Sequence, residues 1–258
     1  MKIEINKNTV FASEGGNEFN QEKHTLILIH GSGMSHIVWS LTEQFLSNNG
    51  FNILSIDLPG HGNSKGSCLK SIEETAEWLD KVINKIGIKD LSILGHSQGC
   101  LVALEYNYKY PKKVKNLIFI GGSYEIPVNK ELIDLAKSGS MKALNLMMKW
   151  GYGDSKRFIG GNPVQKIINS SREVSSILAI DLIACNNYKN GNKAAKAVNC
   201  RTLFILGEID KMITIAKGKE FSSLVQNSKT HIIKNCGHMI MFENAFEMRE
   251  EVIKFLKE

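Results

Sequence analysis

The chain has 258 residues, of which 43% are hydrophobic, and its formal net charge is +6. This size and composition suit one enzyme-sized folded unit with a substantial buried core. No apolar run approaches the ~18 residues that a membrane span needs, so the sequence predicts no membrane span.

The amino terminus and the cysteines favour a cytoplasmic protein. Residues 1–5 alternate between apolar and polar side chains like an edge strand, and they lack the apolar core of a signal peptide. The cysteines are odd in number and have no ligand-like spacing, which favours a reduced protein over a disulfide scaffold and predicts no zinc site. They are Cys68, Cys100, Cys185, Cys200 and Cys236.

Short apolar segments that alternate with helical periodicity predict an α/β fold with a mostly parallel sheet flanked by helices. The amino-terminal edge of the sheet is expected to be antiparallel. Strands are expected at 2–5, 9–13, 26–30, 52–56, 91–95, 117–121, 202–206 and 230–234. Helices are expected near 38–48, 71–86, 98–109, 214–225 and 244–257. The helix at 71–86 begins with Ser71 and Glu74 in capping-box spacing.

The segment Gly95-His96-Ser97-Gln98-Gly99 joins the strand at 91–95 to the helix at 98–109. A strand that becomes a helix within one residue forces that residue into a strained conformation, so the positions two before and two after it must be nearly free of side chain. Glycines at 95 and 99 satisfy this requirement. The turn would lift the Ser97 hydroxyl clear of the sheet, which predicts a nucleophile.

The strand pattern is interrupted between residues 126 and 200, where only helical periodicity with glycine interruptions is found. This predicts a helical insertion at 126–200 in a core made of residues 1–125 and 201–258. One expected helix begins at Asn162-Pro163, a cap residue followed by proline at the first helical position. Apolar faces are expected from Leu132, Ile133, Leu135 and Ala136 and from Met141, Leu144, Met147 and Met148.

A serine hydroxyl is a poor nucleophile alone, so the motif predicts a base and an acid elsewhere. His238 follows the strand at 230–234, and strand-end loops at the carboxyl edge of a parallel sheet collect active sites. The other histidines lie in or before strands, in early loops, or directly beside Ser97. We therefore predict His238 as the base.

Asp210 follows the strand at 202–206 and is the predicted acid. The 28 positions between Asp210 and His238 fit one helix and one return strand, which would bring the carboxylate to Nδ1 of His238. Glu208 is the competitor, although it lies closer to the strand end, where a glutamate more often caps a turn. Glu125 is a second, weaker alternative.

The order Ser97, Asp210, His238 resembles that of the α/β-hydrolase superfamily. His30-Gly31-Ser32-Gly33 resembles the His-Gly loop of that family, and the run from Asp57 to Ser64 resembles its D-x-P-G-x-G-x-S turn. The resemblance implies that the amides of Ser32 and Gln98 form the oxyanion hole and that 126–200 is a cap over Ser97. Asp57 and His61 are interpreted as structural residues of a turn.

The resemblance implies a serine hydrolase that cleaves a small-to-medium ester, thioester or lactone through an acyl-enzyme on Ser97, without cofactor or metal. Alternatives on the same triad are carbon–carbon bond hydrolysis and cofactor-free peroxidase activity. The alternative from another class is a ligand-binding receptor or pseudoenzyme on this scaffold.

The insertion carries the excess positive charge, since residues 126–201 hold twelve lysines and arginines against five acidic residues. A solvated basic face without a role is the simplest interpretation. The functional alternative is attraction of an anionic substrate or an acidic carrier protein. Nucleic acid is not expected as a partner because no binding motif accompanies the charge.

Overall fold

The computed structural model describes residues 1–153 and 174–258. Its sheet has eight strands in the order β1-β2-β4-β3-β5-β6-β7-β8, antiparallel between β1 and β2 and between β2 and β4, and parallel elsewhere. The predicted α/β-hydrolase fold class is confirmed, including the antiparallel edge. The strands are β1 Lys2–Ile5, β2 Asn8–Ser13, β3 Thr25–Ile29, β4 Asn52–Ile56, β5 Leu91–His96, β6 Val114–Ile120, β7 Arg201–Gly207 and β8 Ser228–Ile233.

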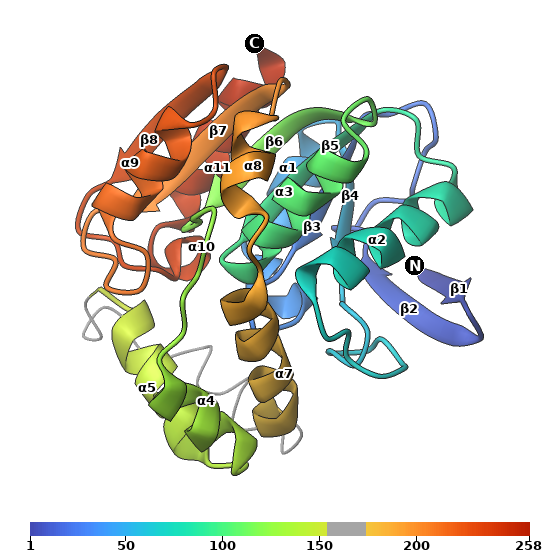
Figure 1. The fold of residues 1–258 in the computed structure, drawn as a ribbon. Helices are drawn as coiled ribbons and strands as arrows, with labels where there is room; N and C mark the ends of the chain where they lie inside the picture. Colours follow the sequence, from blue (N-terminus) through green and yellow to red (C-terminus); the bar gives the residue numbers. More distant parts are fainter. Residues whose placement is uncertain (154–173) are drawn as a thin grey trace.

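Helices cover both faces of the sheet (Figure 1). In β3, Ile27 and Ile29 pack in the layer that contains α2 and α3, whereas Leu26 and Leu28 pack in the layer that contains α1 and α11. Strands covered on both faces are apolar at nearly every position, which explains their nearly continuous apolar runs. The helices are η1 His36–Trp39, α1 Glu43–Asn48, α2 Ile72–Ile86, α3 Gln98–Lys109, α4 Lys130–Lys137, α5 Met141–Gly151, α7 Val174–Asn187, α8 Gly191–Lys196, α9 Ile215–Ser223, α10 Ile240–Glu243 and α11 Ala245–Lys257.

The predicted helix at 38–48 is wrong in detail, because the structure has a 3₁₀ turn, η1, followed by the separate helix α1. Trp39 is fully buried, and the chain folds tightly around it with hydrogen bonds from Ser40 N–H to Ile37 C=O and from Thr42 N–H to Trp39 C=O. The sequence analysis also missed α8 and α10. Each has six residues or fewer, too short for a helical period to show.

Helices α4, α5 and α7 gather beyond one end of the strands (Figure 1). The apolar faces expected from residues 132–136 and 141–148 lie on α4 and α5, although Met141 itself is exposed. The part of the expected third helix before Val174, with Asn162 and Pro163, lies outside the described residues. None of the helices in the two described ranges is both long and apolar enough to cross a membrane.

Candidate active site

Ser97 lies in the turn between β5 and α3 with φ 54° and ψ −115°, a backbone conformation that residues other than glycine rarely adopt. A Cβ atom on Gly95 would lie 2.3 Å from the carbonyl oxygen of Gly99, and one on Gly99 would lie 2.3 Å from that of Ile29. The amide of Ser97 donates to the carbonyl of Ile120 on β6, 3.1 Å away. The two glycines therefore permit the strained turn that the spacing predicts.

His238 and Asp210 come together across the neighbouring strands β8 and β7. Nδ1 of His238 lies 2.7 Å from Oδ2 of Asp210, and both side chains are buried. The other carboxylate oxygen, Oδ1, accepts the amides of Met212 and Ile213 at 2.7 and 2.9 Å. Asp210 is thus held in place by its own loop and can fix the ring orientation and tautomer of His238.

The competing acids lie elsewhere. Oε2 of Glu208 accepts the amide of Asn235 at 2.8 Å on the exposed side of the turn, and Glu125 is exposed. Glu208 therefore caps a turn, and the structure brings Asp210 to the histidine. Nε2 of His238, the nitrogen on the far side of the ring from Asp210, is buried without a hydrogen-bond partner among the described residues.

The backbone of His238 is held from two sides. Its amide donates to the carbonyl of Gly151, the last residue of α5, at 2.7 Å. Its carbonyl lies 3.1 Å from Nε2 of His96, whose ring packs against the His238 ring with 4.7 Å between centroids. Burial, together with the neighbouring His238, holds the pKa of His96 well below the usual histidine value. His96 is therefore a neutral donor that supports His238, a role the sequence analysis did not assign.

Glu243 is a second residue that the sequence analysis missed. Its carboxylate accepts the amides of Gly153, Gly237 and Met239 at 2.9, 3.0 and 3.2 Å. Burial raises the pKa of this carboxyl above its ordinary value. Glu243 ties the end of the α5 segment to the loop that carries His238. No sequence motif marked it, because its partners are backbone amides brought together by the fold.

Ser32 and Gln98 flank the candidate nucleophile. Gln98 is the first residue of α3, where amides have no partner within the helix, so its N–H is available to a ligand. Ser32 is buried, and its hydroxyl lies 3.7 Å from Sγ of Cys185 on α7. Both residues adjoin Ser97: Gln98 follows it in the chain, and Ser32 lines the same cavities.

Two cavities open beside Ser97 and His238, with volumes of about 210 and 20 Å³. The described lining residues include no carboxylate and one amine, that of Lys211 in the larger cavity. The walls are otherwise mostly apolar, and methionines are prominent in them. The lining methionines are Met34, Met147, Met148, Met212 and Met239.

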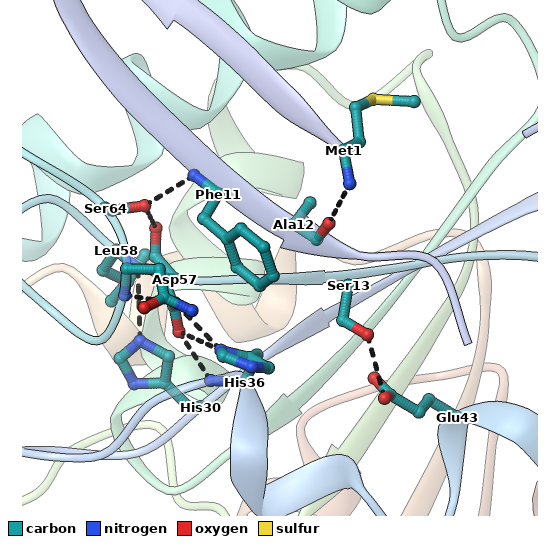
Figure 2. A network of polar contacts seen from close by, with 11 residues as sticks. Met1, Phe11, Ala12, Ser13, His30, His36, Glu43, Asp57, Leu58 and Ser64 are labelled. Atoms are coloured by element: carbon teal, nitrogen blue, oxygen red, sulfur yellow. Dashed lines mark hydrogen bonds and ion pairs between the residues drawn. The ribbon is translucent and has the colours of Figure 1, made fainter. Parts of the chain in front are cut away.

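Asp57 has a structural role (Figure 2). One of its carboxylate oxygens accepts the amide of His36 at 2.6 Å, and the His36 ring nitrogen Nδ1 lies 2.9 Å from both oxygens. Ser64 Oγ donates to the Asp57 carbonyl at 2.7 Å, and the Leu58 amide donates to Nε2 of His30 at 3.2 Å. Burial alone would raise the pKa of Asp57, but the hydrogen bonds between this carboxylate and His36 contribute to a lowered pKa. The Phe11 amide of β2 donates to Ser64 Oγ at 2.9 Å, so the turn is held both to β2 and to the loop after β3.

Asp181, on α7, is the third residue that the sequence analysis missed. Oδ2 of this buried carboxylate accepts the amide of Gly33 at 2.7 Å and lies 2.9 Å from Nε2 of His61. A signal was present in the sequence, since Asp181 is the only charged residue in α7. No group of three or more metal-ligating side chains is found among residues 1–153 and 174–258.

Residues 24–156 match the family described as alpha/beta hydrolase fold. The chain is 23% identical to the 2-hydroxy-6-oxononadienedioate/2-hydroxy-6-oxononatrienedioate hydrolase 1 of Pseudomonas putida, over 93% of this chain and 90% of that protein. A thermophilic esterase superposes on all of this chain and 96% of its own with a TM-score of 0.85 and 25% identity. The enol-lactonase of Burkholderia xenovorans LB400 superposes over the full length of both chains with a TM-score of 0.85 and 17% identity. These similarities support a hydrolase, and with more than half of its residues matched to the family, the chain belongs to the alpha/beta hydrolase fold family.

Proposed function

We propose that the protein is a serine hydrolase that cleaves a small-to-medium carboxylic ester, thioester or lactone through an acyl-enzyme on Ser97. The observation that carries this proposal is the 2.7 Å contact between His238 Nδ1 and Asp210, which leaves Nε2 unpartnered beside a cavity that Ser97 also lines. A nucleophile, a base and an orienting acid are the minimum for acyl transfer by serine.

In the proposed mechanism, Nε2 of His238 accepts the Ser97 proton as Oγ attacks the substrate carbonyl. Asp210 remains ionised and stabilises the imidazolium that forms. The amides of Ser32 and Gln98 donate to the oxyanion, and His238 then protonates the leaving group. Water, activated by the same histidine, hydrolyses the acyl-enzyme and restores Ser97.

The cavity favours a modest apolar acyl group. Its volume of about 210 Å³ is below the usual range for ligand pockets, about 300–1,000 Å³. Methionine side chains adapt to irregular apolar groups. The segment 126–200 would act as a cap, since α5 holds the His238 backbone through Gly151 and α7 holds the Gly33 amide through Asp181.

The first experiment asks whether the protein is an enzyme or a binding protein on this scaffold. A fluorophosphonate probe should label the wild-type protein at one serine, and Ser97→Ala should abolish the labelling. Ser55→Ala is the matched control, because Ser55 is fully buried on β4 and its hydroxyl has no partner among the described residues. Labelling that persists in Ser97→Ala would overturn the assignment of the nucleophile.

The second experiment defines the substrate. Hydrolysis of p-nitrophenyl esters of increasing acyl length should reach its highest kcat/KM at a short or medium chain and fall once the acyl group outgrows the cavity. Acyl thioesters and lactones of matched size test the other two bond types. Turnover of all three that depends equally on Ser97 would place the protein among general acyl hydrolases.

Carbon–carbon bond hydrolysis is the second candidate, favoured by the similarity to the Pseudomonas putida hydrolase named for a 2-hydroxy-6-oxo dienedioate. Such a ketone diacid has no ester, so its hydrolysis breaks a carbon–carbon bond. Lys211 in the cavity wall is suited to one of the carboxylates. The test follows the loss of dienolate absorbance of a 2-hydroxy-6-oxo dienedioate on incubation with the protein. A kcat/KM for this compound at least tenfold above that for the best ester would favour carbon–carbon bond hydrolysis over ester cleavage.

A further inference from the structure

Asp181 joins three segments that are distant in sequence. It lies on α7, while Gly33 is in the loop after β3 and His61 is in the loop after β4. The Gly33 amide and the His61 ring both contact the same carboxylate oxygen, and both side chains of the Asp181–His61 pair are 3% exposed. An ionised acid without partners at such depth would cost several kcal/mol, so these contacts are what allow it to stay there.

Both ring nitrogens of His61 face hydrogen-bond acceptors, an arrangement that favours the doubly protonated ring. Nδ1 lies 3.1 Å from the carbonyl oxygen of Pro59, and Nε2 faces the Asp181 carboxylate, and only a doubly protonated ring can donate to both. Burial by itself lowers the pKa of His61, but Asp181, the Pro59 carbonyl and Asp57 oppose it, and the pKa is raised. Burial also opposes the charge on Asp181, yet His61 and the Gly33 amide leave its pKa lowered.

The other titratable neighbours of the pair are His30 and the thiols of Cys68 and Cys185, and burial, with Asp181, raises the pKa of these thiols to about 11 and about 12. The His30 ring packs 4.9 Å from the His61 ring, and burial lowers the pKa of His30 to about 4. Nε2 of His30 accepts the Leu58 amide, which leaves the proton on Nδ1, and Nδ1 donates to the carbonyl of Gly31 at 2.9 Å. His30 therefore contributes a hydrogen bond to the loop but no charge near neutral pH.

These contacts orient two successive peptide planes. In a trans peptide, C=O and N–H point in opposite directions. The Gly31 carbonyl is held by His30 Nδ1 and by the Met34 amide, so the Ser32 amide of the same peptide points away from them. The next peptide is held through the Gly33 amide by Asp181. The direction of the Ser32 N–H thus depends on both ends of the loop.

We propose that Asp181, paired with His61, is a positioning residue that aims the Ser32 amide at the oxyanion by holding Gly33 from α7. The inference rests on the proposed function, because it assigns Asp181 to the oxyanion hole of that reaction. Under this proposal, catalysis also requires that α7 packs in its place against the loop after β3. Cys185, one turn further along α7, adjoins Ser32 and extends the same contact.

The test compares Asp181→Ala and Asp181→Asn with the wild-type enzyme on the best ester. Misplacing an oxyanion donor should lower kcat of Asp181→Ala about 10- to 100-fold with KM changed by less than about threefold, since the ground-state carbonyl gains little from the donor. Affinity for a trifluoromethyl ketone that forms the tetrahedral adduct should fall by a similar factor. Asp181→Asn should recover part of kcat, because its amide oxygen can still accept from Gly33.

The matched control is Glu105→Ala. Glu105 is also a buried acid that joins the core to the segment after α7, because its Oε2 accepts from Tyr188 Oη and Asn190 Nδ2 at 2.9 and 2.8 Å. It lines neither cavity beside Ser97. Glu105→Ala should lower Tm as Asp181→Ala does, yet leave kcat within twofold of wild type.

The pH profile gives an independent readout. The charged pair exists above the lowered pKa of Asp181, and it is lost as pH rises through the raised pKa of His61 in the folded protein. If the pair positions Ser32, wild-type kcat should fall on the alkaline side of its pH profile as the pair is lost. In Asp181→Asn the anion that opposes the effect of burial on His61 is gone, so this fall in kcat should move to lower pH. Glu105→Gln should leave the alkaline fall in kcat at the wild-type pH.

The outcomes separate the two proposals. If Ser97→Ala keeps esterase activity, the proposed hydrolase mechanism fails. If Ser97→Ala is inactive while Asp181→Ala and Asp181→Asn keep wild-type kcat, ketone affinity and alkaline limb, only the positioning role is overturned. Should Asp181→Ala fail to fold, Asp181→Asn alone decides, because it preserves the volume and one acceptor.

Discussion

The strained conformation of Ser97 depends on the absence of two side chains. Gly99→Ala would place a Cβ atom 2.3 Å from the Ile29 carbonyl oxygen and 2.9 Å from that of His30, both of them backbone atoms that cannot move aside cheaply. We expect a loss of about 1–3 kcal/mol of unfolding free energy, and lower activity because the turn shifts. Thermal unfolding and ester turnover measure the two effects.

Gly151→Ala is the control for this substitution. A Cβ atom there would meet its nearest neighbour, Met239 Cγ, at 3.5 Å, which is ordinary van der Waals contact. Its carbonyl, which accepts the His238 amide, is unchanged by the substitution. A Gly99→Ala variant as stable and active as Gly151→Ala would contradict the steric account of the turn.

Two substitutions test which acid orients His238, Asp210 or its competitor Glu208. Asp210→Asn should lower kcat about 10⁴-fold, because the amide would favour the wrong tautomer of His238, the proposed base. Glu208→Gln should stay near wild type, since the hydrogen bond of Glu208 in the described part of the chain is to a turn amide on the exposed side. Steady-state kinetics of the two variants measure these effects. A large loss of kcat in Glu208→Gln with wild-type kcat in Asp210→Asn would make Glu208 the acid.

The histidines His30, His61, His96 and His238 are held in different surroundings. Burial lowers the pKa of His30 to about 4 and that of His96 well below its usual value. The Asp181 carboxylate opposes the effect of burial on His61, whose pKa is raised. His238 has an acid at one nitrogen and a cavity at the other. The roles follow from partners rather than from residue type.

Among the helices, α2 offers a direct test of an element read from the sequence. Ser71 Oγ accepts the Glu74 amide at 3.1 Å, and the Glu74 carboxylate accepts the Lys70 amide at 3.0 Å. Ser71→Ala should cost about 1 kcal/mol of unfolding free energy and leave kcat unchanged, because α2 lines neither cavity beside Ser97. Ser71→Asp keeps a cap acceptor and should remain near wild type in a thermal melt. Equal melting temperatures for both variants would show that the cap contributes nothing.

The segment between β6 and β7 contacts the core through both α5 and α7. At one end α5 accepts the His238 amide through Gly151, and Glu243 holds Gly153. At the other end, α7 binds the Gly33 amide and His61 through Asp181. These contacts support the proposal that residues 126–200 form a cap, whose position would affect both the proposed base, His238, and the loop that carries Ser32.

At the scale of the whole molecule, the net charge of +6 is concentrated in residues 126–201. If this charge and Lys211 capture anionic substrates, kcat/KM for an anionic ester should fall between about 0.01 and 0.15 M salt, as the Debye length shrinks from about 30 to 8 Å. Lys137, Lys142 and Lys149 lie on α4 and α5, whereas Lys156, Arg157, Lys166 and Arg172 lie outside the described residues.

A neutral ester of the same size is the internal control for the salt series, since it gains nothing from steering. Lys211→Glu should raise KM for the anionic ester about tenfold and leave the neutral ester unchanged. Lys115→Glu, an exposed lysine on β6 paired with Asp90 and absent from both cavities, is the matched charge reversal. Equal salt sensitivity for charged and neutral esters would make the basic surface a solvated face without a role in capture.

The sequence by itself determined the strands, the main helices of the core and the strained turn at Ser97, because these depend on local properties. Apolar runs bounded by turn residues marked the buried strands, and Ser71 and Glu74 marked the start of α2. The spacing of Asp210 and His238 was readable too, because one helix and one return strand must connect neighbouring parallel strands.

Only the tertiary structure decided which polar groups share a buried site. Asp181 meets Gly33 from 148 positions away, and Glu243 meets Gly153 from 90 positions away. His96 and His238 are 142 positions apart. A buried charge is stable only where donors converge on it, and convergence is a property of packing between distant segments. For that reason the strained turn at Ser97 could be predicted from five neighbouring residues, whereas the acids that hold its surroundings could not.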